Sequence, residues 1–508
     1  MPPAEEKKSR HQAPREEADS TFFHSSSVRR LTPYPQRFLL VMADVLAILV
    51  AFAVGGRLAA FINETLLGRL YLSLQPETVW SRSVETSMIT AGLLFWLSIR
   101  GHYSRRTPFW AEMKDICQGL FVAALLDATI LFLLQIQFSR LWFIQTWLWS
   151  AITLPFARIW IRRLLTTFGR WVVPVIVVGD EENSRDAVDA LHSETYLGYR
   201  VVGVLPISSF VDSPAPSAGD NTSESVRRRR ALIEMYAHYK VKFALLAPSA
   251  SSLERMQPLL RDLNTTHAPY GIIPPLRGLS VLNMKAGYFF SHDVMMLSAS
   301  NNLANLQSRF IKRAFDIVVS GTALLLLLPF FAVVALVIRL DGGSSFYGHR
   351  RVGIKNRLFG CLKFRTMVID ADARLEAVLK SDPVKAAEWQ RDQKLRDDPR
   401  VTRVGRFLRA TSLDELPQLI NVLRGDMSLV GPRPVTPTEL LKYGEDASYY
   451  LLTRPGITGL WQVSGRNDTG YERRVQLDCW YVRNWSLWQD IAIIFKTIPA
   501  VLMKSGAY

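Results

Sequence analysis

Two adjacent carboxylates, Asp414 and Glu415, are the residues of this 508-residue chain best suited to chemistry. An ionised carboxylate can attack phosphorus or hold Mg²⁺. The surrounding segment, TSLDELPQL, also allows a capping box, with Ser412 as N-cap and Glu415 at the third helical position. Proline favours the first helical position, so Pro417 instead predicts a helix that begins near it. Both acids would then lie just ahead of a positive helix end, which favours their ionised form.

Basic side chains in turn-forming motifs accompany this acidic pair. Guanidinium groups on proline-fixed turns suit bidentate capture of phosphate oxygens. A solvated surface would explain any one of these cations, but their grouping around one acidic pair indicates a phosphate site. The candidate phosphate-binding residues are Arg350, Lys363, Arg365, Arg409, Arg433, Arg454 and Arg466.

Six sequence blocks closely resemble bacterial polyprenyl-phosphate hexose-1-phosphate transferases. They are KRAFD (Lys312–Asp316), LKFRTM, TSLDELPQL, NVLRGDMSLVGPRP, RPGITGLWQVSGRND and WSLWQDI. The resemblance covers the chain from about residue 308 to its last residue. Upstream, HYSRRTPFW (His102–Trp110) and the expected spans are similar to the large form of this family. Within that form, the chain is most similar to undecaprenyl-phosphate galactose phosphotransferases.

The resemblance implies an enzyme in which Asp414 is the nucleophile and Glu415 its partner in a dyad. It also implies Mg²⁺, held by one or both acids, and a homodimer. Asp414 would attack the sugar-linked phosphorus of a UDP-hexose, expel UMP and form a sugar-phosphoryl aspartate. Undecaprenyl phosphate would then take the sugar phosphate, as the first membrane step of O-antigen, capsule or exopolysaccharide synthesis.

Several alternatives stay open at this point. The resemblance favours galactose, but galactose and glucose differ at one hydroxyl and no residue here tells them apart. Direct transfer through a ternary complex, with Asp414 as a base or metal ligand, is a second enzymatic mechanism. A non-catalytic scaffold for polysaccharide assembly is an alternative from another class.

The composition limits the classes of protein that fit. The chain is 49% hydrophobic yet 21% charged, which predicts membrane spans in one part and a polar catalytic part elsewhere. The formal charge of +16 suits nucleic acid, anionic lipid or phosphorylated substrates as partners. Without basic-region heptads, zinc-finger spacing or RRM motifs, nucleic acid is not expected. Three cysteines without paired spacing predict neither a disulfide framework nor a cysteine metal site.

The N-terminal third of the chain is expected to be membrane-embedded. Residues 1–36 are polar and predict a disordered tail. Arginine and lysine concentrate before the first apolar segment, between the second and third, and after the fourth. The positive-inside rule therefore puts the tail and everything after residue 165 in the cytoplasm, at a bacterial inner membrane. The four segments, each near the ~20 residues that cross a bilayer, are Phe38–Phe61, Val79–Ile99, Ile116–Ile136 and Leu141–Ile161.

Three acids, Asp44, Glu85 and Asp127, lie within or beside these segments. Intramembrane acids can mark a transport path, and the alternative is pairing between helices or an interfacial position. We expect the three acids to pair between helices or to lie at the membrane interface.

A fifth apolar segment, Ile317–Ile338, is long enough to cross as well. Pro329 lies in its middle, where proline favours a kink, and basic residues flank both ends. We therefore expect a re-entrant helix over residues 315–340 that enters the membrane, bends at Pro329 and returns to the cytoplasmic side.

The segment after Trp171 has the pattern of an α/β layer of doubly wound type. The turn after its first strand places Glu181 where a dinucleotide site needs a second glycine. A structural or regulatory module is therefore expected there rather than a nucleotide site. The expected strands are Val172–Val178, Val201–Leu205, Lys242–Ala247 and Tyr270–Ile273, with a helix over Asn183–His192.

The expected architecture has three domains after the tail. An α-helical four-span membrane region covers residues 37–166, and a degenerate Rossmann-like α/β cytoplasmic domain covers 167–300. An α+β catalytic domain with the re-entrant membrane helix covers 301–508. Near its end, Ile491, Ile494, Phe495 and Ile498 form a helical stripe that suits either an ordinary core helix or an interfacial helix on lipid headgroups.

Overall fold

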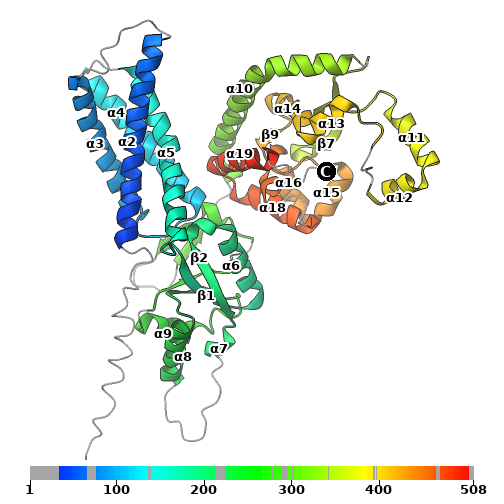
Figure 1. Ribbon diagram of the computed structural model, residues 1–508. Helices are drawn as coiled ribbons and strands as arrows, with labels where there is room; N and C mark the ends of the chain where they lie inside the picture. The colour runs from blue at the N-terminus through cyan, green and yellow to red at the C-terminus, as the bar shows by residue number, and fades with distance from the viewer. Residues whose placement is uncertain are drawn as a thin grey trace, which may run out of the picture. The chain divides into compact units, whose positions relative to one another are not determined.

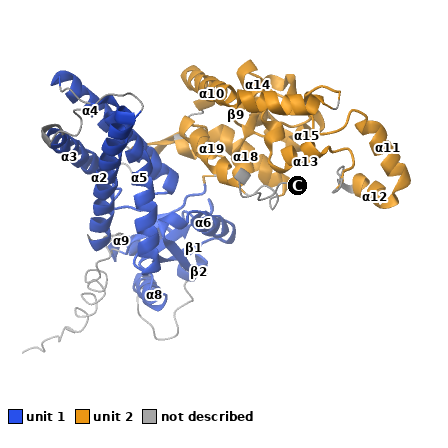
Figure 2. Ribbon diagram, turned by 45° about the horizontal axis from the view of Figure 1, so that its top comes forward, with its two compact units in different colours: residues 1–275 blue, residues 276–508 orange. Residues whose placement is uncertain are grey.

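The chain forms two compact units, Met1–Pro275 and Leu276–Tyr508 (Figure 2). The computed structural model describes residues 34–65, 76–135, 139–211, 224–266, 268–276, 278–288, 295–299, 302–340, 342–392, 395, 398–464 and 470–502. The expected N-terminal tail and Arg466 therefore lie outside the described residues, apart from the last residues of the tail.

The first unit begins with four long helices that stand as a bundle (Figure 1). Glycines allow α2 and α5 to approach closely, because small residues let helix backbones come together. A Cβ at Gly55 would lie 2.9 Å from the backbone nitrogen of Thr146, and one at Gly56 would lie 2.9 Å from the indole nitrogen of Trp142. The helices are α2 (Tyr34–Thr65), α3 (Pro76–Ile99), α4 (Phe109–Leu133) and α5 (Arg140–Thr167).

Helices thus occur at all four positions where spans were expected. Among the described residues, three helices are long and apolar enough to cross a membrane, namely Pro35–Thr65, Phe109–Leu133 and Leu306–Arg339. The first two correspond to α2 and α4. The other two helices of the bundle contain buried arginines, which lower their hydropathy, so that a crossing by α3 and α5 stays a prediction.

The three acids of this region are paired, as expected, Asp44 and Asp127 with an arginine of another helix and Glu85 with an arginine of its own helix. Asp44 on α2 accepts hydrogen bonds from Arg158 Nη2 on α5 at 2.6 Å and from the hydroxyl of Tyr103 at 2.7 Å. Arg82 on α3 bonds Glu85 at 2.5 Å and Asp127 on α4 at 2.7 Å. Buried charges are tolerated when they are paired and hydrogen-bonded in this way.

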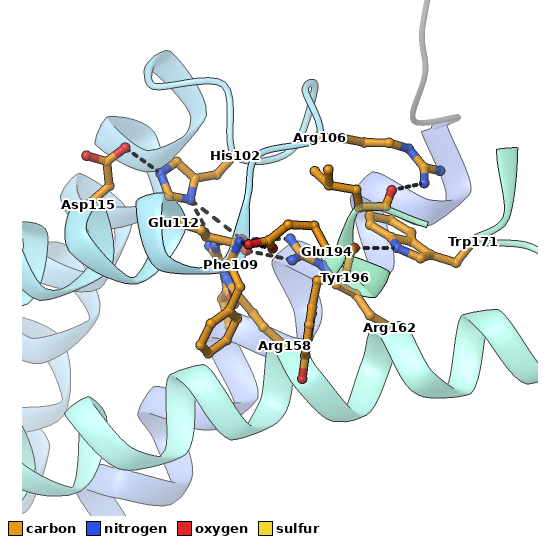
Figure 3. Close-up of polar contacts among 12 residues, drawn as sticks. His102, Arg106, Phe109, Glu112, Asp115, Arg158, Arg162, Trp171, Glu194 and Tyr196 are labelled. Carbon is orange, nitrogen blue, oxygen red and sulfur yellow. Dashed lines mark hydrogen bonds and ion pairs between the residues drawn. The ribbon is translucent and has the colours of Figure 1, made fainter. Parts of the chain in front are cut away.

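The motif His102–Trp110 joins the bundle to the domain that follows (Figure 3). Arg106 stacks over the ring of Trp171 at 4.4 Å and donates a 2.6 Å hydrogen bond to the carbonyl of Leu197. Phe109 packs against Tyr196, with 4.9 Å between ring centroids. The loop between α3 and α4 therefore contacts the connection between the first two strands of the next domain.

That domain is a parallel four-stranded sheet in the order β2-β1-β3-β4. Its apolar residues form one cluster under α8 and α9 and a second under α6, so that helices cover both faces. The doubly wound prediction is confirmed. The elements are β1 (Val173–Gly179), α6 (Glu181–Ser193), η2 (Thr195–Leu197), β2 (Tyr199–Leu205), α7 (Ser208–Val211), α8 (Glu224–His238), β3 (Phe243–Ala247), α9 (Gln257–Thr265) and β4 (Tyr270–Ile272).

The turn after β1 lies where the strand order reverses, which is the usual ligand position in such folds. Asp180 accepts hydrogen bonds from the backbone N–H of Ser249 at 2.7 Å and from the hydroxyl of Ser252 at 2.5 Å. Asn183 donates to the carbonyl of Pro248 at 2.5 Å. Hydrogen bonds to the loop after β3 thus hold the turn in place. Such bonds are compatible with the expected structural role of this domain.

The second unit begins with a short hairpin and a long helix. These elements are η3 (Val281–Asn283), β5 (Lys285–Tyr288), β6 (Met295–Ser298), η4 (Asn302–Ala304) and α10 (Leu306–Arg339). An antiparallel hairpin and helices before the acidic pair follow, with β7 (Phe346–Val352), η5 (Ile354–Asn356), β8 (Leu358–Phe364), α11 (Ala371–Ser381), α12 (Pro383–Asp392) and α13 (Arg403–Ala410).

Short elements surround a two-stranded parallel sheet in the rest of this unit. They are η6 (Leu413–Glu415), α14 (Gln418–Arg424), β9 (Ser428–Val430), α15 (Pro437–Leu440), η7 (Leu441–Asp446), α16 (Ala447–Leu451), β10 (Gly456–Thr458), α17 (Leu460–Val463), α18 (Tyr471–Asn484) and α19 (Leu487–Leu502). On α19, Ile493 is buried against the core, whereas Phe495 and Ile498 are exposed. The helix thus has one core-facing side and one exposed apolar side.

Polar residues at the start of α10 attach it to this core. Lys312 donates to Asp490 at 2.7 Å and to the carbonyl of Val430 at 3.0 Å. Asp316 accepts from the backbone N–H of Leu429 at 3.1 Å. Further along, α10 changes direction (Figure 1), and Pro329 is the proline within it. The bend fits the expected re-entrant helix, and the return to the starting side stays a prediction.

Candidate active site

Asp414 and Glu415 lie on the short 3₁₀ turn η6, between α13 and α14. Ser412 precedes the turn in the left-handed region, with φ of 54°, and its side chain makes no capping hydrogen bond. The capping-box interpretation is therefore wrong, and the helix begins at Gln418 directly after Pro417, as the proline predicted. Asp414 is buried with 12% of its side chain exposed, whereas the Glu415 side chain is 33% exposed.

Lys363, on β8, contacts both acids. Its Nζ lies 2.7 Å from Glu415 Oε1 and 3.5 Å from Asp414 Oδ2. Burial acts to lower the pKa of Lys363, but Glu415 and Asp414 raise it above its ordinary value, so the ammonium stays charged. The structure thus brings together the two predicted acids and one of the predicted cations.

Burial raises the pKa of Asp414 above its ordinary value. Lys363 opposes this by lowering the pKa, while Glu415 raises it further. Burial of Asp414 acts against the expected preference for its ionised form, and the net pKa is raised. A buried carboxylate with few hydrogen bonds is a stronger nucleophile than a fully solvated one.

A pocket opens beside the acidic pair. Arg433, a predicted phosphate-binding residue, lies in its wall together with Glu415. Arg351 lies in the wall and is bonded to Glu439 at 3.0 Å, whereas its predicted neighbour Arg350 is exposed. Successive side chains of a strand point to opposite faces, so β7 presents only one of these arginines to the pocket. The residues that line the pocket are Arg351, Cys361, Glu415, Gln418, Arg433, Pro434, Ile457 and Gln462.

Three further predicted arginines lie elsewhere around the turn. Arg409 donates to the hydroxyl of Thr366 at 2.9 Å, and its charge lowers the pKa of Asp414. Arg365 donates to the carbonyl of Ile338 at 3.0 Å, near the end of α10. Arg454 donates to the carbonyl of Gly425 at 2.6 Å, after the last turn of α14. Only Arg409 of these three thus acts on the acidic pair, and the other two cap helix ends.

The sequence of this chain is similar to those of known sugar transferases. The family described as bacterial sugar transferase matches residues 307–504, which contain the turn, the pocket and α10. The undecaprenyl-phosphate galactose phosphotransferase of Salmonella typhimurium is 43% identical over 433 residues, covering 84% of this chain and 89% of that protein. The chain belongs to the bacterial sugar transferase family. It is therefore an enzyme, as the resemblance predicted.

Two other relatives of this sugar transferase differ in how similar they are to it. The UDP-galactose-lipid carrier transferase of Erwinia amylovora is 44% identical over 415 residues, covering 82% of this chain and 86% of that protein. The UDP-glucose:undecaprenyl-phosphate glucose-1-phosphate transferase of Escherichia coli is 31% identical over 343 residues, covering 66% and 68%. A second family, described as CoA-binding domain, matches residues 98–274 of the sugar transferase, which contain the doubly wound sheet.

The acidic side chains of the site could hold Mg²⁺ together with the substrate. Within the described residues, no group of three or more His, Cys, Asp or Glu side chains converges on a metal position. Mg²⁺ is commonly bound by one or two carboxylates, completed by water and substrate phosphates. Asp414 and the more exposed Glu415 fit that pattern, with the ammonium of Lys363 already on one side of both.

Sequence reasoning missed several residues at this site. Arg351 was passed over for Arg350, although alternation along the strand would have limited the choice to one of them. Gln418 and Gln462 also line the pocket, yet no sequence signal separates them from ordinary helix residues. Arg466 lies outside the described residues, so its predicted role stays a prediction.

Proposed function

We propose that this sugar transferase moves hexose 1-phosphate, specifically galactose 1-phosphate, from a UDP-sugar to undecaprenyl phosphate and releases UMP. The observation that carries the proposal is a buried carboxylate, Asp414, 3.5 Å from the Lys363 ammonium and beside a pocket lined by arginines. The reaction class is supported by relatives whose names contain undecaprenyl phosphate. The reaction would begin O-antigen, capsule or exopolysaccharide synthesis.

The reaction proceeds in two displacements. A carboxylate oxygen of Asp414 attacks the sugar-linked phosphorus, a new P–O bond forms, and the bond to the bridging oxygen breaks as UMP leaves with that oxygen. A phosphate oxygen of undecaprenyl phosphate then attacks the same phosphorus and releases Asp414 as carboxylate. Dividing the exchange lets a water-soluble donor and a membrane-bound acceptor use one site in turn.

The surrounding residues supply charge at each step. Lys363 stabilises the carboxylate pair and offsets the negative charge that gathers as the donor approaches. Arg433 and Arg351 line the pocket where the diphosphate would bind. When bound by Asp414 and Glu415, Mg²⁺ would neutralise charge on the diphosphate and on the leaving group.

Galactose is favoured over glucose by the degree of similarity. Two relatives whose names contain galactose are 43% and 44% identical to this chain, whereas the relative named for UDP-glucose is 31% identical. We also propose that the first unit crosses a bacterial inner membrane four times, that α10 is re-entrant, and that the acidic pair faces the cytoplasm. Basic residues at both ends of α10 and its apolar, exposed middle support this arrangement.

The test uses full-length protein in nanodiscs prepared without and with undecaprenyl phosphate. UDP-galactose labelled in its sugar-linked phosphate should label the protein in the absence of acceptor, and Asp414→Asn should abolish that label. Turnover by wild type without any trapped label would favour direct transfer in a ternary complex. A panel of UDP-sugars, assayed by UMP release, should give the highest kcat/KM with UDP-galactose, and a preference for UDP-glucose would overturn the sugar assignment.

A further inference from the structure

Two arginine side chains stack on the ring of one tryptophan, Trp461, next to the pocket. The guanidinium of Arg433 lies 5.6 Å from the ring centroid of Trp461, and that of Arg474 lies 5.0 Å from the same ring. Arg433 lines the pocket that contains Glu415, and Arg474 comes from the first turns of α18. Arg474 also stacks on Tyr471 at 5.3 Å, so aromatic rings fix its position from two sides.

Within the part of the chain that the structure describes, neither guanidinium forms a hydrogen bond or ion pair with an acid, although Arg474 acts to lower the pKa of Glu439 and, together with Arg433, that of Asp478. Arg474 is only 8% exposed, and its Nε and Nη2 are buried without a hydrogen-bond acceptor. The nearby acids are engaged elsewhere: Glu439 is bonded to Arg351 at 3.0 Å, and Asp478 accepts from the hydroxyl of Tyr443 at 2.8 Å. Arg474 is therefore a buried cation with unused donors.

Such an arrangement is costly unless a ligand completes it. A buried donor without an acceptor destabilises the folded protein, and more so when the donor is charged. The two cations also repel each other. Burial lowers the pKa of Arg433, and although Glu415 raises it, Arg474 and Arg351 lower it further, to a net value below the ordinary one. A group with several anionic oxygens would satisfy both guanidiniums, and phosphate matches their fork geometry.

We propose that Arg433 and Arg474, aligned by Trp461, together bind one phosphate group of a substrate. The inference rests on the proposed function, because only that reaction brings phosphate groups to this pocket. It extends that function by assigning Arg474, which lies outside the sequence motifs singled out for phosphate. The phosphate belongs either to the nucleotide donor or to the lipid acceptor, and the experiment separates these two sources.

The experiment compares Arg474→Gln, Arg474→Lys and a control, Arg483→Gln, in full-length protein. Arg483 lies on the same helix and, like Arg474, has a buried Nε without an acceptor among the described residues, but its guanidinium stacks on Tyr449 at 5.5 Å instead of on Trp461. kcat/KM is measured for UDP-galactose at saturating undecaprenyl phosphate, and then for undecaprenyl phosphate at saturating UDP-galactose. Apparent melting temperatures are recorded with and without UMP, and with inorganic phosphate.

Arg474→Gln should lower kcat/KM about 10- to 100-fold for one substrate, as expected for loss of a charge-assisted hydrogen bond. A lower kcat/KM for UDP-galactose would mean that Arg474 binds a phosphate of the nucleotide donor. A lower kcat/KM for undecaprenyl phosphate would mean that it binds the phosphate of the lipid acceptor. Arg474→Lys should recover part of the loss, and Arg483→Gln should stay within twofold of wild type. Values within twofold for both substrates in Arg474→Gln would overturn the proposal.

Melting temperatures separate ligand binding from a structural role. Because two buried donors of Arg474 lack acceptors among the described residues, Arg474→Gln should not lower the melting temperature of the free protein, and the stabilisation by UMP or phosphate should shrink. A lower melting temperature with unchanged ligand stabilisation would show a structural role instead and overturn the proposal. The same shifts in an Asp414→Asn background need no turnover, so they test the phosphate site even if the covalent mechanism proves wrong.

Discussion

The ammonium of Lys363 lies 3.5 Å from Oδ2 of Asp414 and holds a positive charge against a buried carboxylate. The two residues come from β8 and from the turn η6, which are separated by α11, α12 and α13 in the sequence. Their contact sets the ionisation of Asp414, because burial raises the pKa of this residue and Lys363 lowers it. Activity at neutral pH should therefore depend on Lys363.

Lys363→Met should shift the pH dependence of catalysis. Removing the cation leaves burial and Glu415 to raise the pKa of Asp414 further above its ordinary value. Since the attacking form is ionised, the acidic limb of the kcat/KM profile should move to higher pH. Lys380→Met is the control, because Lys380 pairs with Glu376 on the exposed surface of α11. An unchanged acidic limb in Lys363→Met would show that Lys363 does not set this ionisation.

Asp414→Asn should stabilise the protein while it abolishes turnover. The pKa of Asp414 is raised on folding, so the stability that this group contributes is full below its ordinary pKa and is lost as pH rises through the raised pKa. At pH 7 the charged form is penalised, and the neutral amide removes that penalty. We expect activity to fall by at least about 1,000-fold, as for loss of a nucleophile. The melting temperature should rise by roughly 2–4 °C for each ~1 kcal/mol relieved.

The pH dependence of that stabilisation provides the check. The gap in melting temperature between Asp414→Asn and wild type should be larger at pH 8 than at pH 4, where the wild-type carboxyl becomes protonated. A variant that melts below wild type at pH 8 would mean that the charge of Asp414 stabilises the turn through Lys363, contrary to the burial argument.

Arg158→Leu should destabilise the helical bundle. Arg158 is buried on α5 and bonds Asp44 on α2 at 2.6 Å and Glu112 on α4 at 2.5 Å. Figure 3 shows Arg158 beside Glu112. Removing one partner of a buried ion pair costs ~3–5 kcal/mol because the other charges stay buried, which is roughly 10 °C in melting temperature. Arg163→Leu, at an exposed position of the same helix, should melt within about 2 °C of wild type. Equal melting temperatures for both variants would contradict a structural role for the network.

Local patterns predicted a large share of the fold and part of the site. The apolar run before Gly179 predicted β1, and Pro417 predicted the start of α14, because these signals depend on neighbouring residues alone. Asp414, Glu415 and Lys363 were found because each stands in a motif, although no sequence pattern shows that the lysine reaches both acids.

The remaining residues depend on tertiary structure. Arg365 and Arg454 had the same apparent chemistry as Arg433 in the sequence, yet they bond backbone carbonyls at helix ends. Which carbonyl lies near an arginine is decided by packing of distant segments. The same holds for Arg474, whose unused donors become visible only when the burial around Trp461 is known. Choosing Arg351 instead of Arg350 required knowing which face of β7 lies toward the pocket.

The bend in α10 leads to a prediction about membrane topology. Single cysteines at Gln307→Cys and Ser344→Cys mark exposed positions at either end of the helix. They are introduced into Cys117→Ser protein, since Cys361 and Cys479 are buried. If α10 is re-entrant, an impermeant maleimide should label both positions in inside-out vesicles and neither in right-side-out cells. Labelling of the two ends from opposite sides would show that α10 crosses.

Pro329→Leu tests what produces the return. Proline removes a backbone hydrogen bond and clashes with the preceding turn, at a cost of ~3 kcal/mol in a regular helix, so leucine should favour a straight α10. In that variant we expect labelling of Ser344→Cys from the periplasmic side and loss of UMP release, because the acidic pair would no longer meet a cytoplasmic donor. Pro155→Leu is the matched control, since Pro155 also lies inside a long helix, α5, of the other compact unit. Unchanged labelling in both variants would mean that the flanking arginines and lysines, rather than the proline, hold the two ends of α10 on one side.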